Sequence, residues 1–362
     1  MLAHADFRAI WRRFRLQCRS VEVVRSCALK AYRKLARAQE PATGLQLPSR
    51  AHAQPARYLS VVAIAKNEGR YLREWIEFQR LMGVEHVYLY DNGSTDDSSA
   101  IVAPYVAEGF VTVIPWVTFD AGAHPQRQAY AHALCNFGSQ FRWMAFIDLD
   151  EFLFPVTAPN LVEVLSGYED CPCLCVAWFD FGFGGHESAP AGLVIENYTQ
   201  RAPFPLAPEL RNWKSIVQPA VVARVTGAHM FELVSGITGG FDERKNPVTS
   251  KIRDDVLPRG AVLRVNHYFT RSRQEFVVKV NRIMTGFGSS SPEYWKKKKQ
   301  RIAEMIEVET VRDDVILRFA QEVRERVFSA SLSFTRKRRN KMVVCHADES
   351  LALSDSKIAS HL

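Results

Sequence analysis

The chain has 362 residues, of which 47% are hydrophobic and 24% are charged. This length and apolar content suffice for one large or two small folded domains, and they exclude a wholly disordered protein. No run of 18 apolar residues is present and five arginines interrupt the first nineteen positions. The sequence therefore predicts neither a membrane-spanning helix nor a signal peptide, and we expect a cytoplasmic protein.

The positive charge is concentrated in a basic N-terminal arm, residues 1–55. Residues 1–40 hold ten Lys and Arg against three acids, which gives +7 of the net charge of +8. Because arginines alternate with hydrophobic residues such as Trp11 and Phe14, the arm could form an amphipathic helix on the inner face of the cell membrane. The alternative is a solvated arm, or a helix packed on the body of the protein.

A second basic cluster, residues 336–341, opens a polar tail that we expect to be disordered up to residue 362. Neither basic region is accompanied by a zinc-finger spacing or an RNA-binding signature, so we expect no nucleic-acid partner. The seven cysteines are too few and too clustered for a disulfide framework. Cys173 and Cys175 alternate along a predicted strand, which favours small core residues over zinc ligands.

Strand-like and helix-like runs alternate between the two basic regions. In chain order they predict a strand at 60–65, a helix at 71–82 ended by Gly83, a strand at 86–90, a helix at about 97–107, a strand at 110–117, a helix at 126–141 and a strand at 143–149. Such alternation is typical of an α/β fold whose mostly parallel sheet carries helices on both faces. We assign this fold to residues 56–290, followed by C-terminal helices at 291–335.

Polar residues follow three of these strands at the point where each strand ends. Lys66-Asn-Glu68 follow the first strand, Asp91-Asn92 end the second, and Asp148-Leu-Asp150 end the fourth. In open parallel sheets, ligands bind in the crevice beyond the carboxyl ends of the strands. The three groups are therefore predicted to share one rim.

Asp148 and Asp150 lie in a strongly apolar stretch, and two residues apart on a strand they project to one side. Burying two neighbouring carboxylates without compensation costs roughly several kcal/mol, whereas a bound divalent cation removes the conflict. Oxygen ligands of this kind suit Mg²⁺ or Mn²⁺. The alternative is a turn at the strand end with solvated acids.

Several sequence blocks follow one another in a fixed order between Tyr58 and Gly286. They include Lys66-Asn-Glu68, Tyr90-Asp-Asn92, Phe146-Ile-Asp-Leu-Asp-Glu-Phe152, Trp178-Phe-Asp-Phe-Gly-Phe-Gly-Gly-His186, Lys214-Ser-Ile-Val-Gln-Pro219 and Asn266-His-Tyr268. In these blocks the chain resembles the glycosyltransferase family 2-like group that is closest to family 92. It departs at Phe183 and Gly184, where small serines are usual, and at Gln218, where an arginine is usual.

The resemblance implies a GT-A fold and an inverting transfer of a sugar from a nucleotide sugar, usually a uridine diphosphate sugar, to a glycan, polysaccharide or lipid-linked acceptor. It implies that Mn²⁺ or Mg²⁺ is held by Asp148, Asp150 and His267. The implied nucleotide-sugar contacts are Lys66, Asn67, Glu68, Asp91, Asn92, Asp148, Lys214 and Arg282. A structural role for His267, and solvated positions for Lys214 and Arg282, remain the alternatives.

An inverting transfer also needs a base beside the acceptor hydroxyl. Glu187 lies next to His186 in a glycine-rich loop, and we expect it to be this base, with Asp180 as the second candidate. A plain solvated loop acid is the alternative for Glu187. Two rival functions also stay open: a non-catalytic nucleotide-sugar or glycan-binding module on the same fold, and a membrane-surface adaptor that uses the basic regions.

Overall fold

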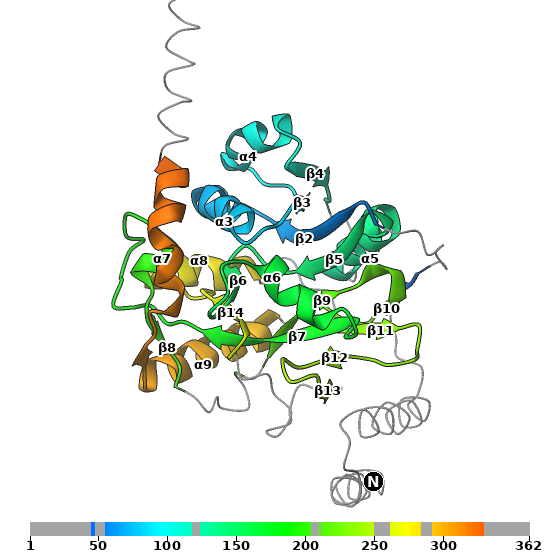
Figure 1. The fold of residues 1–362 in the computed structure, drawn as a ribbon. Coiled ribbons are helices and arrows are strands. Elements are labelled where there is room, and N and C mark those ends of the chain that lie inside the picture. The colour runs from blue at the N-terminus through cyan, green and yellow to red at the C-terminus, as the bar shows by residue number, and fades with distance from the viewer. Residues whose placement is uncertain are drawn as a thin grey trace, which may run out of the picture.

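The computed structural model describes residues 45–47, 55–117, 124–203, 210, 212–249, 261–283 and 292–328 (Figure 1). Most of the basic N-terminal arm and the whole polar tail lie outside these ranges, as do the amphipathic helix and the disorder predicted there. Among the helices within these ranges, none combines the length and the apolar character that crossing a membrane requires.

A ten-stranded sheet forms the centre of the described structure (Figure 1). Its strands are β2 (Arg57–Ala65), β3 (His86–Asp91), β4 (Val111–Pro115), β5 (Phe141–Phe146), β6 (Glu151–Pro155), β7 (Cys173–Asp180), β9 (Trp213–Val217), β12 (Gly240–Phe241), β13 (Pro247–Val248) and β14 (Leu263–His267). The main path runs β13-β12-β7-β9-β5-β2-β3-β4, and β14 joins β6 to β7 beside this path.

The sheet has a parallel half and a mixed half. β5, β2, β3 and β4 are all parallel neighbours. β9 runs antiparallel to both β5 and β7, while β14 runs parallel to β7 and antiparallel to β6. The predicted α/β class, with a mostly parallel sheet flanked by helices, is confirmed.

The helices are α3 (Gly69–Leu81), α4 (Ser98–Ala107), α5 (Pro125–Phe137), α6 (Leu161–Leu165), α7 (Val194–Asn197), α8 (Arg273–Ile283) and α9 (Pro292–Val308), with 3-10 turns η1 (Gly138–Gln140), η2 (Ser166–Tyr168), η4 (Pro219–Val221) and η5 (Val315–Phe319). Residues 320–328 are also helical. Small sheets pair β1 (Leu45–Gln46), β10 (Val222–Val225) and β11 (Phe231–Leu233), and β8 (Gln200–Arg201) with β15 (Val311–Arg312).

Two hydrophobic cores lie on opposite faces of the parallel half. Alternate residues of β2 face opposite ways, because side chains along a strand have a period of two. Leu59 and Val61 pack in the core that contains Trp75 of α3, whereas Val62 packs with Tyr130 of α5. Helices thus cover both faces, which explains why the central strands are apolar on both sides.

The predicted strand at 143–149 differs from the observed one. β5 spans Phe141–Phe146 and is followed by a turn, after which β6 begins at Glu151. The apolar run continues through Ile147 and Leu149 because both are buried in the core, not because the strand continues. Asp148 and Asp150 therefore lie in a turn and not on one face of a strand.

Candidate active site

A buried tryptophan fixes the backbone of the turn between β5 and β6 through hydrogen bonds. Trp75 Nε1 of α3 donates to the carbonyl oxygens of both Asp148 and Glu151, at 3.1 and 2.9 Å. The Asp148 amide in turn donates to Glu151 Oε2 at 2.9 Å. These bonds place three acidic side chains at the carboxyl end of β5, and each acid meets a different set of partners.

Asp148 is directed toward β9 and α5. Its Oδ1 accepts from Gln126 Nε2 at 2.6 Å, and its Oδ2 lies 2.8 Å from Lys214 Nζ. The Lys214 side chain is only 1% exposed, and its ammonium also lies 3.3 Å from Glu151 Oε2. Burial opposes the charge of Lys214, but Asp148 and then Glu151 outweigh it and raise the pKa of the lysine. Lys214 is thus a buried counter-ion of the acids and not a solvated residue.

Asp150 is directed toward β14 and α8. Its carboxylate pairs with Lys279 of α8, and its Oδ2 lies 3.6 Å from His267 Nε2 at the end of β14. Burial would raise the pKa of Asp150, but Lys279 and then His267 outweigh burial and lower the pKa well below its usual value. Asp150 is therefore an ionised, buried carboxylate.

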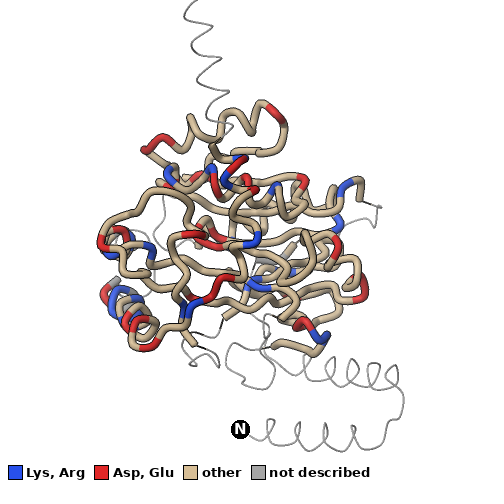
Figure 2. The backbone as a smooth tube through the Cα atoms, turned by 60° about the vertical axis from the view of Figure 1, so that its left-hand side comes forward, with Lys and Arg blue, Asp and Glu red and all other residues tan. Residues whose placement is uncertain are grey.

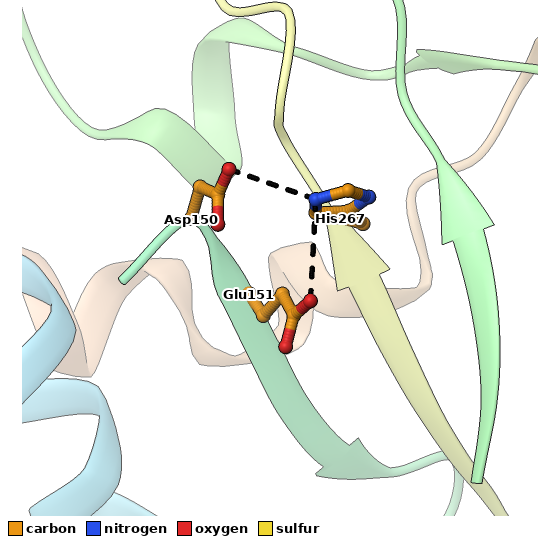
Figure 3. A group of neighbouring side chains, drawn as sticks. All are labelled: Asp150, Glu151 and His267. Atoms are coloured by element: carbon orange, nitrogen blue, oxygen red, sulfur yellow. Dashed lines mark ion pairs between the residues drawn. The ribbon is translucent and has the colours of Figure 1, made fainter. Parts of the chain in front are cut away.

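Asp150, Glu151 and His267 form a compact cluster (Figure 3). One ligand atom from each lies within 4.8 Å of the others, and Glu151 Oε1 is 3.9 Å from His267 Nε2. Among the described residues, Glu151 Oε1 has no hydrogen-bond partner although it is buried. Burial is also the main reason why the pKa of Glu151 rises to about 8.

A third carboxylate, that of Asp180, orients His267 through the ring nitrogen that faces away from the cluster. Its Nδ1 lies 2.7 Å from Asp180 Oδ1 at the end of β7, and its ring stacks on Trp178 with the centroids 4.2 Å apart. Burial lowers the pKa of His267, but Asp150 and then Asp180 outweigh it and raise the pKa to about 9. The two nitrogens are thus distinguished, because Nδ1 is held by Asp180 while Nε2 faces the cluster.

These residues fit a divalent cation. The two carboxylates are ligands that suit Mn²⁺ and Mg²⁺, and the imidazole favours a transition metal such as Mn²⁺ over Mg²⁺. The oxygen of Glu151 that lacks a hydrogen-bond partner among the described residues is a buried acceptor that a cation would satisfy. A carboxylate behind the histidine is also the usual outer partner of a metal-bound imidazole. Within the described residues, this is the group of acids and histidines that is compact enough to hold an ion.

The rim formed by β2 and β3 lies next to this cluster and is internally braced. Asn67 has a φ of 56°, which is rare for a residue other than glycine, and its side-chain oxygen accepts from the amide of Thr95 at 2.7 Å. Asp91 Oδ1 accepts from the amide of Ser94 at 3.0 Å, and the Asn92 amide donates to Ala65 at 2.8 Å. The polar residues predicted at the two strand ends are therefore brought together.

Glu68 connects this rim to Arg271, which follows β14 in the chain. Its Oε2 accepts from Arg271 Nη1 at 2.8 Å, and the Arg271 guanidinium carbon lies 3.8 Å from the centroid of the Tyr71 ring. Arg271 is buried and has a φ of 48°. Lys66 is exposed directly after β2. Arg282 is in α8, but its side chain lies outside the described part of the chain.

The candidates for the base lie in two places. Asp180 is buried against His267, as described above. Glu187 has a side chain that is 75% exposed, with Oε2 3.7 Å from Arg273 Nε at the start of α8. Next to it, His186 Nε2 lies 3.2 Å from the carbonyl oxygen of Asn197. Of the three residues, Glu187 is the one that the solvent reaches most freely.

Three residues of the site had no role assigned from the sequence: Glu151, Arg271 and Lys279. Glu151 directly follows Asp150, so its proximity to the cluster could have been anticipated from the chain. Arg271 and Lys279 carry no such signal, because their contacts with Glu68 and Asp150 join segments that are far apart in the chain.

Comparison with known proteins finds a matching sequence family. The sequence profile of Glycosyltransferase family 92 matches residues 64–306. A family 92 protein of Ricinus communis is 29% identical over 187 residues, which are 49% of this chain and 32% of the relative. One from Oryza sativa subsp. japonica is 30% identical over 188 residues, 50% of this chain and 31% of the relative. The chain thus spans about a third of the length of the curated relatives that it matches.

Among solved structures, residues 1–349 of S. aureus TarS in complex with UDP-GlcNAc overlap 68% of this chain and 71% of their own length, at 13% identity and a TM-score of 0.34. Glucosyl-3-phosphoglycerate synthase from Mycobacterium tuberculosis, in complex with Mn²⁺ and UDP-glucose, overlaps 52% of this chain and 67% of its own, at 18% identity and a TM-score of 0.28. Scores this low lend no weight to a shared activity. The family profile, in contrast, covers more than half of the sequence, and the chain belongs to glycosyltransferase family 92.

Proposed function

We propose that this protein is a metal-dependent, inverting glycosyltransferase that transfers a sugar from a uridine diphosphate sugar to a glycan, polysaccharide or lipid-linked acceptor. Its family membership supports the transfer of a sugar. The observation that carries the proposal is the buried cluster of Asp150, Glu151 and His267 at the carboxyl end of β5, beside the rim where ligands of parallel sheets bind.

Asp150, Glu151 and His267 would hold the Mn²⁺ or Mg²⁺ ion, with Asp180 as the residue that orients His267. When bound, such an ion stabilises the negative charge that develops on a departing diphosphate. Asp148, whose side chain is 31% exposed and pairs with Lys214, would face the nucleotide. Asn67, Glu68, Asp91 and Asn92 would contact the nucleoside, and Lys66 and Arg282 would lie near the phosphates.

We propose Glu187 as the base that takes the proton of the acceptor hydroxyl. Its side chain is exposed, so an acceptor can approach it. Asp180 is less suited to this role, because it is buried and its Oδ1 is engaged by His267. His186, held at Asn197, would shape the loop that carries Glu187.

The test is the release of UDP from a panel of UDP-sugars by the full chain, measured with Mn²⁺, with Mg²⁺ and with EDTA. We expect Asp150→Asn and Glu151→Gln to lower turnover about a hundredfold or more, because the charge on the leaving diphosphate is no longer stabilised. Asp170→Asn, on the surface, is the matched control and should keep wild-type turnover.

Two outcomes would contradict the proposal. Equal turnover by wild type and Asp150→Asn would place the chemistry elsewhere. Binding of a UDP-sugar without hydrolysis or transfer at any metal concentration would identify a binding module instead of an enzyme.

A further inference from the structure

Helices α8 and α9 lie side by side near β14, at the end of the sheet that carries the acidic cluster (Figure 1). Each helix contributes one lysine above the same aromatic ring. Lys279 Nζ of α8 is 5.9 Å from the centroid of Phe269, and Lys299 Nζ of α9 is 5.0 Å from it. Two ammonium groups that are 20 residues apart in sequence therefore lie over the ring of Phe269, which is two residues after His267 in the chain.

The two lysines differ in their partners. Lys279 pairs with the carboxylate of Asp150 and donates to the carbonyl oxygen of Phe269 at 3.2 Å. Lys299 is partly buried, and among the described residues no carboxylate forms a salt bridge with it. Lys297 and Lys298, which precede it in the same helix, are exposed.

Within the described part of the chain, the positive charge of Lys299 on α9 is not balanced by a salt bridge, in contrast to that of Lys279. Burial, and next the ammonium of Lys279, lower the pKa of Lys299, while Asp180 and Asp150 act in the opposite sense. Like charges that are held close together in a partly buried place repel each other, and an anion between them removes the repulsion. Lysine is a common phosphate ligand, and hydrogen bonds between ammonium and phosphate groups are stronger than those between neutral groups.

We propose that Lys279 and Lys299 together bind a phosphate group of the substrate beside the acidic cluster, and that Lys279 exchanges Asp150 for a phosphate oxygen when the substrate arrives. The identity of the phosphate depends on the proposed function. In a UDP-sugar transferase it is the diphosphate of the donor, and a phosphate on the acceptor is the other source with the same chemistry. No covalent step is involved.

The experiment is calorimetric titration of the full chain with UDP and with uridine, in the presence of Mn²⁺. Lys299→Met keeps the aliphatic stem on Phe269 and removes the charge, while Lys299→Arg keeps the charge. We expect Lys299→Met to raise the Kd for UDP about ten- to a hundredfold, which is the worth of one charge-assisted hydrogen bond. Binding of uridine should not change, and Lys299→Arg should recover most of the affinity.

Lys297→Met is the matched control, because Lys297 is exposed on the same helix. It should bind UDP like the wild type. If Lys297→Met weakens UDP as much as Lys299→Met does, the effect is a general loss of positive charge, and the proposed pair is wrong. The thermal unfolding midpoint of each variant separates loss of binding from loss of folding, and Lys299→Gln, which also removes the charge, replaces Lys299→Met if that variant does not fold.

Inorganic phosphate distinguishes the two sources. If Lys299→Met leaves UDP unchanged but weakens inorganic phosphate about tenfold or more in a titration at saturating UDP, the pair serves the acceptor. If neither ligand is affected, the inference is overturned, although the proposed transfer could still be observed. Conversely, the wild type could bind inorganic pyrophosphate through Lys299 and fail to bind UDP. That result would support the phosphate site at Lys279 and Lys299 and contradict the proposed UDP-sugar donor.

Discussion

Lys214 neutralises two acids of the site at once. Its ammonium lies 2.8 Å from Asp148 and 3.3 Å from Glu151, and burial prevents water from replacing it. Lys214 on β9 therefore compensates part of the cost of burying the acidic turn. The same residue cannot be read as a surface lysine, because its side chain is 1% exposed.

We expect Lys214→Met to lower the free energy of unfolding by about 3 kcal/mol, because removing one partner of a buried ion pair leaves the other uncompensated. Urea denaturation measures this loss, with Lys297→Met as an exposed control that should change it by less than about 0.5 kcal/mol. A loss below about 1 kcal/mol for Lys214→Met would mean that Asp148 and Glu151 do not depend on the lysine.

At the scale of elements, a buried acid joins α3 to α7. Glu74 of α3 accepts from the backbone amides of Val194 and Ile195, at 2.8 and 3.2 Å. Burial raises the pKa of Glu74 from 4.5 to about 7, although both amides oppose this shift. The contact follows the glycine-rich loop that carries Glu187, so it helps to set the position of that loop.

This raised pKa predicts a dependence of stability on pH. Between about pH 4.5 and pH 7 the folded protein binds the Glu74 proton more tightly than the unfolded chain, so stability is fully present below 4.5 and falls as the pH rises toward 7. The size of the change is on the order of 3 kcal/mol. In Glu74→Gln this titration is absent.

The measurement is the difference in unfolding free energy between wild type and Glu74→Gln, obtained by denaturant titration at several pH values. Other titrating groups are shared and cancel in the difference. The unfolding free energy of the wild type should fall relative to that of Glu74→Gln as the pH rises through this window. A difference that stays constant would show that Glu74 is ionised at its ordinary pKa.

At the scale of the whole molecule, acidic and basic residues are interspersed along the described backbone (Figure 2), and some of them pair in the interior. One such group ties the C-terminal segment to the sheet. Asp313 directly follows β15, and its Oδ2 lies 2.5 Å from Arg201 Nε and 2.8 Å from Arg264 Nη2 of β14. Arg264 and Asp313 are both buried. The segment after α9 is thus anchored to the strand that ends in His267.

We expect Asp313→Asn to lower the free energy of unfolding by about 3–5 kcal/mol, because the buried Arg264 and the partly buried Arg201 lose their counter-ion. Asp314→Asn is the neighbouring control. Its partner Arg312 is exposed, so the change should be within about 0.5 kcal/mol. Thermal or urea unfolding checks both variants, and equal effects would show that the buried group does not anchor the segment.

The sequence was sufficient for the order of the elements in the parallel half. Helix α3 and strands β2 and β3 appear within a few residues of their predicted positions, since amphipathic and apolar periods are local properties. It also predicted that the polar residues after β2 and β3 would meet, because parallel strands end on the same side, and Asn67 contacts Ser94 and Thr95. The turn after Phe146 was missed, because Ile147 and Leu149 stay buried beyond the strand.

Only the tertiary structure decided which partners meet across the site. His267 reaches Glu151 because β14 pairs with β6, and Lys279 of α8, the helix that follows β14 in the chain, pairs with Asp150. More than a hundred residues separate each of these pairs. No local pattern encodes such contacts, because they depend on long-range strand pairing and on buried charges that are stable only when they are paired with opposite charges.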